Sequence, residues 1–367
     1  MKILIIANTK IVFGNELKSE LEKHAKDVYL LDFESLMLSH GSLRDSTYFN
    51  MFSKYKKIPK LHMFFRIYYI AKVIKAIGFE LVNIHYSRWV YLFLLPVLKH
   101  SKFIMTFYGS DFYRTKNLTK KIQSVIYKKA DVLTFTNPLT RDAFVRYYKN
   151  YEKKSHVCRF GLKTLDYIDK NRLRPKNEMK EALGYKRDKI IVTCGYNATR
   201  AQQHHKILKE LLLLEEEILK NVQFVFPMTY GNTSYKEEIK SALEKSRLDY
   251  LVLEEFLYED DNAYVKLASD IMINLLETDS FSGSMQEFLY AQNHVITGSW
   301  LPYELFDKEG IVYTKIESTD ELSPTLTKVL AKVDTDQIDL SVNEGIISIL
   351  SSWKNNIDCW INVYEKN

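Results

Sequence analysis

The feature that most constrains the fold is an alternation of short β-rich runs with helical stretches. Residues 1–165 contain five such runs: KILIIA, DVYLLD, LVNIHY, KFIMTFYG and VLTFTN. Segments with helical spacing separate them, among them residues 16–26, 59–77 and 120–129. Strands that alternate with helices predict a parallel sheet with helices on both faces. We therefore expect residues 1–165 to form a doubly wound, Rossmann-like domain.

A second alternation predicts a second domain of the same α/β class. Residues 166–188 are polar and contain no strand-like run, so we expect a linker there. The alternation then restarts with KIIVTCG, VQFVFPMT, YLVLEEF, IMINLL and HVITG, which predicts another Rossmann-like domain over residues 189–340. Residues 341–367 have helical spacing and are expected to pack back on the N-terminal domain. A chain of 367 residues is long enough for two domains, which we expect to face a central cleft.

The net charge of +6 is distributed unevenly along the chain. Residues 46–130 contain sixteen Lys and Arg against two acids, whereas residues 254–344 contain nineteen Asp and Glu against five Lys. In the basic part, the apolar face of the helix expected over residues 59–77 leaves aromatic and cationic side chains on the remaining surface. These are Phe64, Phe65, Tyr68 and Tyr69 beside Lys60, Arg66, Lys72 and Lys75. Such a surface suits an anionic membrane; the alternative is that the aromatics cover the sheet and the lysines are ordinary solvated charge.

The cysteines, the apolar segments and the absence of nucleotide-binding motifs exclude several classes of protein. Cys158, Cys194 and Cys359 are far apart and form no C-x-x-C pair, which predicts neither a disulfide framework nor a zinc site and favours a reducing cytoplasm. The N-terminus has too few apolar residues for a signal peptide, and the most apolar run, residues 89–98, is half the length that spans a bilayer. Neither G-x-G-x-x-G nor a Walker A sequence is present, and the lone D-x-D at 334–336 lies in a hydrophilic stretch. No cofactor and no metal site are expected, and nucleic acid is not expected as a partner because no matching recognition motif accompanies the basic surface.

One stretch, TDSFSGSMQEFLYAQNHVITG (residues 278–298), places carboxylates on both sides of a helix start. Asp279 lies in the loop after a strand, and Glu287 lies one turn into the following helix. Between them stand the small residues Ser282, Gly283 and Ser284. Backbone N–H groups at such a helix start form a site for a diphosphate, and Glu287 would then reach the hydroxyls of an attached ribose. The alternative is that Ser282 only caps an amphipathic helix and both acids are solvated.

This stretch resembles the E-x7-E signature in the second domain of family 4 glycosyltransferases with the GT-B fold. Over roughly residues 80 to 305, ELVNIHYS, FYGSDF, KADVLTFTNPLTRDAF and LGYKRDKIIVTCGYN are similar to family segments in the same order. Two further segments, GYNATRAQQHHKIL and FPMTYGNTSYKEEI, are similar to parts of the TDP-acetamidofucosyl transferases of surface-antigen assembly. The chain departs from the family pattern in three places. Its first acid is Asp279, the usual diphosphate-binding Arg and Lys have no clear equivalents after Gly195, and Tyr108 stands where His is common.

The resemblance implies two groups of site residues. In the first domain, His85, Tyr108 and Asp111 are the implied catalytic residues. For His85 the alternative is a hydrogen-bonded core histidine, and for Asp111 a turn-capping aspartate. The implied donor-binding residues are Asn197, Arg200, His204, Tyr230, Asp279, Ser282, Gly283, Ser284 and Glu287.

The resemblance also implies an activity. We expect a glycosyltransferase that moves a sugar from a nucleotide-sugar donor to a cell-surface polysaccharide or a lipid-linked glycan. In GT-B enzymes a helix N-terminus and basic side chains stabilise the leaving phosphate, so no metal ion is required. The expected location is cytoplasmic and peripheral, on the inner face of the membrane. Two alternatives stay open, a GT-B sugar-nucleotide epimerase and a non-catalytic glycan-binding homologue.

Overall fold

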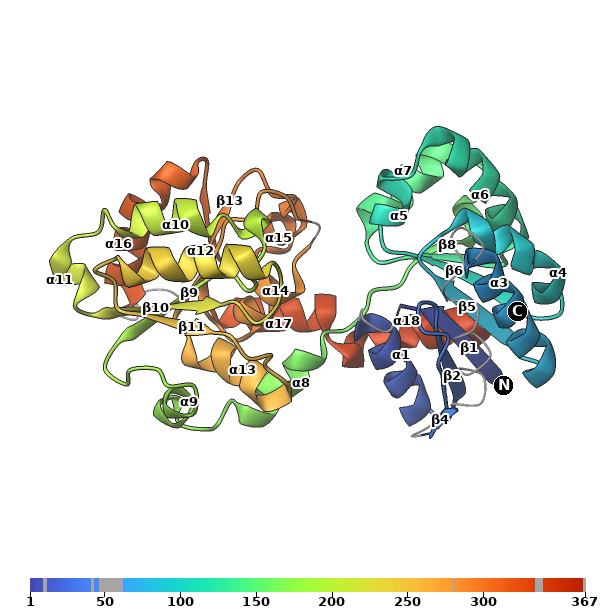
Figure 1. Cartoon of the computed structure of the whole chain (residues 1–367), viewed down its shortest axis with the longest axis horizontal. Helices are drawn as coiled ribbons and strands as arrows, with labels where there is room; N and C mark the ends of the chain where they lie inside the picture. Colours follow the sequence, from blue (N-terminus) through green and yellow to red (C-terminus); the bar gives the residue numbers. More distant parts are fainter. Residues whose placement is uncertain (9–11, 41–42, 46–61, 280, 334–338, 366–367) are drawn as a thin grey trace. The chain divides into compact units, whose positions relative to one another are not determined.

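The computed structural model describes residues 1–8, 12–40, 43–45, 62–279, 281–333 and 339–365. The chain divides into two compact units (Figure 1). Unit 1 comprises Met1–Gly161 and Trp353–Asn367, and unit 2 comprises Leu162–Ser352. Each unit contains one mostly parallel sheet flanked by helices, which confirms the prediction of two doubly wound α/β domains.

The described sheet of unit 1 has the strand order β4-β3-β2-β1-β5-β6-β7-β8. Its strands are β1 (Lys2–Ala7), β2 (Asp27–Asp32), β3 (Leu38–His40), β4 (Leu43–Asp45), β5 (Leu81–His85), β6 (Lys102–Phe107), β7 (Val132–Phe135) and β8 (Ser155–Val157). The β2–β3 and β3–β4 pairs are antiparallel and the others parallel. The sequence did not predict β3, β4 and β8, because strands of 3 residues are too short to show a period-two pattern.

Helices cover both faces of this sheet. On one face, Ile70 of α3 (His62–Ile77) shares a buried cluster with Ile84 of β5. On the other, Trp360 of α18 (Trp353–Glu365) shares a cluster with Leu81 and with α1 (Val12–Lys23). The other described helices of unit 1 are η1 (Trp89–Leu94), α4 (Leu95–Leu98), α5 (Ser110–Tyr113), α6 (Asn117–Lys129), α7 (Pro138–Tyr148) and η2 (Glu152–Lys154). Across the described part of the chain, no helix combines the length and the apolarity needed to cross a membrane.

The C-terminal residues form two helices in place of the single one expected over 341–367. α17 (Ser341–Ser351) packs against α14 (Gly283–Tyr290) within unit 2, whereas α18 packs against α1 within unit 1. The helices are separated at Ser352, where the backbone is extended (φ −81°, ψ 147°). A disulfide between Cys158 and Cys359 ties α18 to the segment after β8. The expectation that no cysteines are paired was wrong, because partners 201 residues apart leave no local signal in the sequence.

The described sheet of unit 2 has the strand order β11-β10-β9-β12-β13-β14, and all its pairs are parallel. Its strands are β9 (Ile190–Cys194), β10 (Val222–Pro227), β11 (Tyr250–Leu253), β12 (Ile271–Asn274), β13 (His294–Gly298) and β14 (Thr314–Ile316). The strand order reverses between β9 and β12. Open α/β sheets bind their ligands at the carboxyl ends of the strands at such a reversal.

The stretch expected to be a linker, residues 166–188, is instead part of unit 2. Its helices α8 (Lys163–Asn171) and α9 (Lys176–Ala182) both pack against α13 (Glu259–Ala268). Leu165 and Ile168 of α8 are buried. Because each of these short helices has only one apolar side, most of its residues are polar, and the sequence resembles a linker. The other described helices of unit 2 are η3 (Arg200–Gln202), α10 (His204–Leu211), α11 (Glu216–Leu219), α12 (Thr233–Glu244), α15 (Glu304–Glu309), η4 (Thr319–Glu321) and α16 (Leu322–Val333).

Candidate active site

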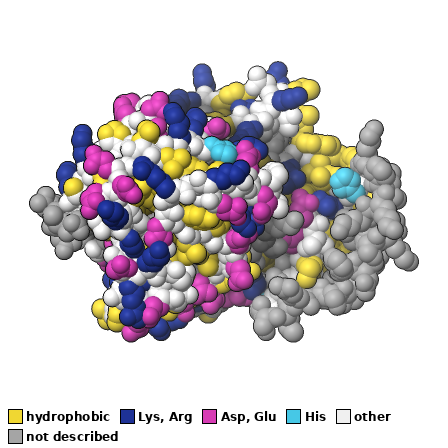
Figure 2. Space-filling view, turned by 60° about the vertical axis from the view of Figure 1, so that its left-hand side comes forward, with side chains coloured by type: hydrophobic (Ala, Val, Ile, Leu, Met, Phe, Trp, Pro, Cys, Tyr) yellow, Lys and Arg dark blue, Asp and Glu magenta, His cyan; other side chains and the backbone are white. Residues whose placement is uncertain are grey.

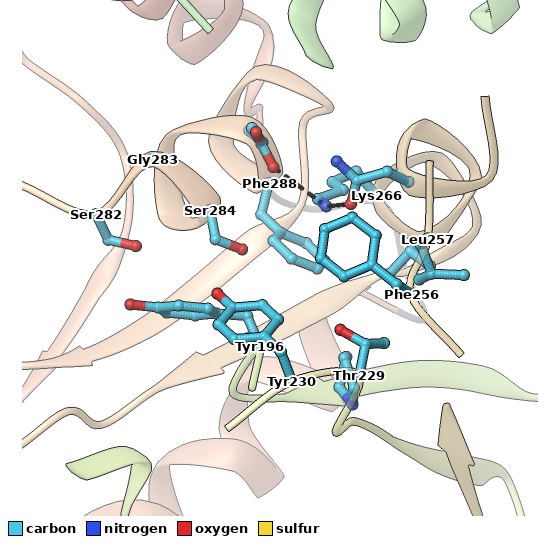
Figure 3. A pocket seen from close by; sticks show the side chains of 14 residues that line it. Tyr196, Thr229, Tyr230, Phe256, Leu257, Lys266, Ser282, Gly283, Ser284 and Phe288 are labelled. Atoms are coloured by element: carbon cyan, nitrogen blue, oxygen red, sulfur yellow. Dashed lines mark hydrogen bonds and ion pairs between the residues drawn. The ribbon is translucent and has the colours of Figure 1, made fainter. Parts of the chain in front are cut away.

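A cavity of about 310 Å³ lies at the carboxyl ends of the unit 2 strands (Figure 3). Residues that end or follow β9, β10, β11 and β12 line it together with α13 and α14. They are Tyr196, Pro227, Thr229, Tyr230, Phe256, Leu257, Asn262, Val265, Lys266, Ser282, Gly283, Ser284, Glu287 and Phe288. The cavity therefore occupies the reversal of strand order, the position at which this fold class binds ligands.

The start of α14 forms one wall of the cavity. Ser282 caps the helix, since its hydroxyl accepts a hydrogen bond from the Met285 N–H at 3.2 Å. Gly283 and Ser284 occupy the first turn, where backbone N–H groups have no acceptor within the helix. The capping role raised as an alternative for Ser282 is thus real, and the capped helix still presents its first turn to the cavity.

Asp279, the first acid of the pair, is not among the residues that line the cavity. Its carboxylate accepts hydrogen bonds from the Ser282 N–H at 3.1 Å and from the Tyr303 hydroxyl. Asp279 therefore holds the loop that leads into α14, and its predicted contact with the donor stays a prediction.

Glu287, the second acid, forms an ion pair with Lys266 in the cavity wall. Lys266 Nζ lies 3.1 Å from Glu287 Oε2, and the two side chains are only 6% and 12% exposed. Lys266 also donates a hydrogen bond to Asn262 Oδ1. Removal of either partner would leave the other charge nearly buried without an ion pair, which is costly.

Aromatic rings form the opposite walls. Figure 3 shows Tyr196 and Tyr230 across the cavity from Ser284, with Phe256 toward the side of Lys266. The ring centroids of Tyr230 and Phe256 are 6.2 Å apart. Both rings are about half exposed, at 50% and 52%. Asn197 does not line the cavity but donates to the Tyr230 hydroxyl at 3.4 Å, so it supports that wall.

The structure does not bring Arg200 and His204 into the cavity. Arg200 is a surface residue whose guanidinium pairs with Glu238 at 2.7 Å. His204 is fully buried beside Phe226 and Tyr235, and this burial lowers its pKa to about 4. Their predicted role in donor binding therefore has no contact to support it and stays a prediction.

A second pocket, of about 190 Å³, lies at the carboxyl ends of strands in unit 1. It is lined by Asn8, Phe33, His85, Tyr86, Arg88, Tyr91 and Tyr108. His85 ends β5, and its Nδ1 lies 3.0 Å from Tyr108 Oη. Burial lowers the pKa of His85 to about 3 and raises the pKa of Tyr108, so both side chains are neutral near pH 7.

Arg88 places a positive charge at this unit 1 pocket. Its guanidinium carbon lies 4.7 Å from the ring centroid of Phe33 and 5.4 Å from that of Tyr86. Tyr86 has a φ of +66°, a left-handed conformation that costs free energy in a residue other than glycine. Strain of this kind is common at binding sites, and here it turns the chain directly after β5.

Asp111 lines neither of these two pockets. Its carboxylate accepts hydrogen bonds from the N–H groups of Ser87 at 2.8 Å, Gly109 at 3.0 Å and Tyr108 at 3.1 Å. Burial raises its pKa to about 6 in spite of these donors. These are the contacts of a turn-capping aspartate, and its catalytic role stays a prediction.

Sequence reasoning missed Tyr196, Phe256 and Lys266. Tyr196 and Phe256 follow β9 and β11 in the same way that Tyr230 follows β10. This shared position just after a strand was a usable signal. Lys266 belongs to no motif and lies 21 residues before Glu287, so only the fold shows that the two side chains meet.

Comparison with known proteins finds one family match and several solved structures with the same fold. Residues 2–137 match the family model described as Glycosyl transferase 4-like. No curated protein sequence matches the chain. A solved glycosyltransferase from Rickettsia africae has a TM-score of 0.76 at 16% identity, covering 99% of this chain and 97% of that one. Sucrose-phosphate synthase from Thermosynechococcus elongatus has a TM-score of 0.72 at 12% identity over 99% and 98% of the two chains. Anabaena HepE in complex with UDP has a TM-score of 0.70 at 11% identity over 98% of each chain.

The fold shared over nearly the whole chain is that of GT-B glycosyltransferases. The family match covers most of the first domain. The protein thus has the fold of GT-B glycosyltransferases, and residues 2–137 of its first domain match the Glycosyl transferase 4-like family model.

Proposed function

We propose that this protein is a glycosyltransferase that takes its sugar from a nucleotide-sugar donor bound in the unit 2 cavity and adds it to a cell-surface polysaccharide or lipid-linked glycan. One observation carries the proposal: the start of α14 and the carboxylate of Glu287 line the same cavity at the reversal of strand order. The structures of HepE with UDP and with UDP-glucose support a donor of this class.

The chemistry of the cavity suits such a donor. As the bond between sugar and diphosphate breaks, negative charge builds on the leaving phosphate, and the amides of Gly283 and Ser284, which line the cavity, would stabilise it. Glu287 would accept the ribose hydroxyls, and the rings of Tyr230 and Phe256 would stack on the base. Because helix amides can supply the charge stabilisation, we propose a reaction that requires no metal ion.

A thermal-shift screen with UDP, GDP, TDP and their sugars tests donor binding. A ligand that binds only the folded state at one hundred times its Kd stabilises that state by about 2.7 kcal/mol. We expect one nucleoside diphosphate to raise the melting temperature of the wild type. Glu238→Ala changes an exposed acid outside the cavity and should show the same rise. If none of the three nucleotides shifts the melting temperature at millimolar concentration, the donor proposal fails.

An exposed aromatic surface of unit 1 supports a membrane-bound acceptor. Phe64 of α3 and Trp89 and Phe93 of η1 form a ring triad with centroid separations of 6.5, 5.6 and 6.3 Å. These rings are 46%, 43% and 49% exposed. Tyr68 is 60% exposed, and Lys72 Nζ lies 5.0 Å from the centroid of its ring. Aromatic rings beside cations suit the interface of an anionic bilayer.

This aromatic surface, Phe64, Tyr68, Trp89 and Phe93, differs from the one expected on α3 alone. Tyr69 and Arg66 are buried, and Arg66 pairs with Glu34 at 2.7 Å. The expectation that both lie on the surface was wrong, because the apolar face of α3 is wider than its isoleucines suggest. Phe65 is partly buried, and Lys60 lies outside the described residues.

A second helix that packs against η1 also exposes apolar side chains. α6 and α3 both pack against η1. α6 exposes apolar side chains among lysines: Leu118, Ile122 and Val125 beside Lys121, Lys128 and Lys129. By contrast, the face of unit 2 turned forward in Figure 2 has Lys and Arg interspersed with Asp and Glu. We therefore propose that the α3–η1–α6 side of unit 1 binds the anionic leaflet in which a lipid-linked acceptor lies.

A further inference from the structure

A stripe of polar side chains is buried in the middle of the unit 1 sheet, on the face that α18 covers. Asn83 and His85 of β5, Thr106 of β6 and Thr134 of β7 are 0%, 2%, 0% and 0% exposed. Their strands place them side by side, since Thr106 is in register with both His85 and Thr134. Burying polar groups costs free energy unless each finds a hydrogen-bond partner. Apolar residues would pack there at less cost, so this polar stripe needs an explanation.

Hydrogen bonds join this stripe to α18 on one side and to the unit 1 pocket on the other. The Asn83 amide nitrogen donates to Tyr364 Oη at 2.7 Å and lies 3.1 Å from His85 Nε2. The Asn83 carbonyl oxygen accepts from Thr106 Oγ1 at 2.8 Å. At the far end, His85 Nδ1 lies 3.0 Å from Tyr108 Oη, and Tyr108 lines the pocket.

The orientation of the Asn83 amide decides where His85 carries its proton. An amide nitrogen can only donate, so His85 Nε2 accepts and is unprotonated. The neutral ring then has its proton on Nδ1 and donates it to Tyr108 Oη. Tyr108 thus uses a lone pair toward His85 and keeps its own hydroxyl proton for the pocket. If the Asn83 amide were turned by 180°, the direction of these hydrogen bonds would reverse, and Tyr108 would donate its proton to His85 instead.

We propose that Asn83 and His85 are positioning residues that hold Tyr108 as a hydrogen-bond donor to a sugar oxygen of the ligand in the unit 1 pocket. The identity of that ligand as a glycan rests on the proposed function. The proton arrangement itself does not. In this arrangement Tyr108 orients the sugar and does not act as the base that removes its proton.

His85 stays neutral throughout the range in which such an enzyme works. Its ring contacts the rings of Phe160 and Trp360, with centroids 5.8 and 6.2 Å away, and burial lowers its pKa to about 3. Several ionisable side chains surround it. They are Tyr86 and Arg88 after β5, Tyr91 of η1, Tyr108 after β6, Asp111 behind Tyr108, and Tyr364 of α18.

Nuclear magnetic resonance of protein labelled with ¹⁵N-histidine tests the proton arrangement without any ligand. A protonated and an unprotonated ring nitrogen have well-separated ¹⁵N shifts, and the His85 signals are identified by their loss in His85→Gln. We expect the wild type to have His85 protonated on Nδ1 alone between pH 6 and 8. Protonation on Nε2 in place of Nδ1 would overturn the proposal, whether or not any sugar transfer has been detected.

Asn83→Asp tests the positioning role, because it replaces the amide donor with an acceptor of the same size. The new carboxylate would draw the His85 proton to Nε2, so that Nδ1 accepts the Tyr108 proton and the pocket loses its donor. We expect the tautomer to switch and kcat for sugar transfer to fall at least tenfold near pH 8. Thr134→Val removes a polar group that bonds Thr106 but makes no hydrogen bond to Asn83, His85 or Tyr108, and it should keep the wild-type tautomer.

The pH profile separates positioning from a merely structural effect. In Asn83→Asp the nearby carboxylate raises the pKa of His85, and below that pKa the ring is protonated on both nitrogens. Nδ1 then donates to Tyr108 again, so kcat of the variant should rise as the pH falls, relative to the wild type. A variant that keeps the Nδ1 tautomer, or loses activity equally at all pH values, would contradict the proposal. If no donor supports transfer, the proposed function fails while the tautomer result still decides the proton arrangement.

Discussion

At the scale of single residues, the proposed contact with the donor is made by Glu287, a carboxylate that is only 12% exposed. Its ion-pair partner is Lys266, whose Nζ lies 3.1 Å from Glu287 Oε2. The ion pair uses one carboxylate oxygen, Oε2, and the other is free to face ribose hydroxyls in the proposed complex. The two residues therefore act as one unit, and a test has to separate the loss of a ligand contact from the loss of a buried partner.

Glu287→Ala should weaken binding of the preferred nucleoside diphosphate by about 1.5 to 3 kcal/mol, the cost of losing hydrogen bonds to a charged acceptor. It also leaves Lys266 buried without its partner, which should lower the free energy of unfolding by about 3 to 5 kcal/mol. Adding Lys266→Met should restore most of this stability and none of the affinity. Calorimetric titration of both variants checks the prediction. Wild-type affinity in the folded double variant would show that Glu287 does not contact the nucleotide.

Residues beside a strand end or a helix start were predictable, because local sequence determines where those ends fall. Ser282, Gly283, Ser284 and Glu287 were found this way, and the structure places all four at the cavity. Arg200 and His204 were placed by resemblance alone, and each is instead engaged in unit 2 by a surface ion pair or by core packing. Lys266 required the fold, since its contact joins two helices whose sequences carry no sign of each other.

At the scale of elements, the α3–η1–α6 side of unit 1 exposes apolar side chains that the core of the unit does not bury. α3 buries one face against the sheet, while Phe64 and Tyr68 remain on its exposed face. η1 adds two rings from a segment of only 6 residues. In the sequence, η1 was noted only as part of an apolar run too short to span a bilayer, so Trp89 and Phe93 were not predicted as membrane contacts.

Binding to vesicles tests this surface. Each Lys near an anionic leaflet contributes about 1 kcal/mol, so charge reversal at Lys72 and Lys75 should weaken binding to vesicles with anionic lipid by at least ~30-fold. Replacing Trp89 and Phe93 by Ser should weaken binding further, and raising the salt should weaken binding of the wild type. Reversal at Lys245 and Lys328, exposed on unit 2, is the matched control and should change little. A wild type that ignores anionic vesicles at low salt would remove the membrane proposal and favour a soluble acceptor.

The strands and long helices were easier to predict than the point at which one unit ends and the other begins. The long runs with clear alternation became strands, whereas α8, α9 and the split between α17 and α18 were missed. Short amphipathic helices with one apolar side resemble linkers in composition. The assignment of α18 to unit 1 depends on partners far away in sequence, such as Asn83 for Tyr364 and Cys158 for Cys359.

At the scale of the whole molecule, three buried histidines make stability depend on pH. Burial lowers the pKa of His85 to about 3 and those of His204 and His294 to about 4, below the unfolded value of 6.5. The unfolded chain therefore binds more protons than the folded one at mildly acidic pH, so stability is full above about pH 6.5 and falls as the pH drops toward these lowered values. Between pH 7.5 and 5.5 each histidine should cost about 1.4 kcal/mol.

Urea unfolding at the two pH values checks this prediction. Asp111, with its pKa raised to about 6, works in the opposite direction and offsets roughly 1 kcal/mol of the loss. His204→Phe removes one histidine that packs between aromatic side chains and should reduce the pH dependence by about 1.4 kcal/mol. An unchanged pH dependence in that variant would mean that His204 has the same pKa in the folded protein as in the unfolded chain.

The central claim is sugar transfer from a nucleotide donor held in unit 2, and the most direct test is to follow the labelled sugar. The protein is incubated with the radiolabelled sugar of the nucleotide that stabilises it and with a membrane extract as acceptor. We predict that label appears in the lipid or polysaccharide fraction in step with release of the nucleoside diphosphate, and that Glu287→Ala with Lys266→Met loses both signals together. Donor converted to its epimer without transfer, or donor bound and never consumed, would contradict the account.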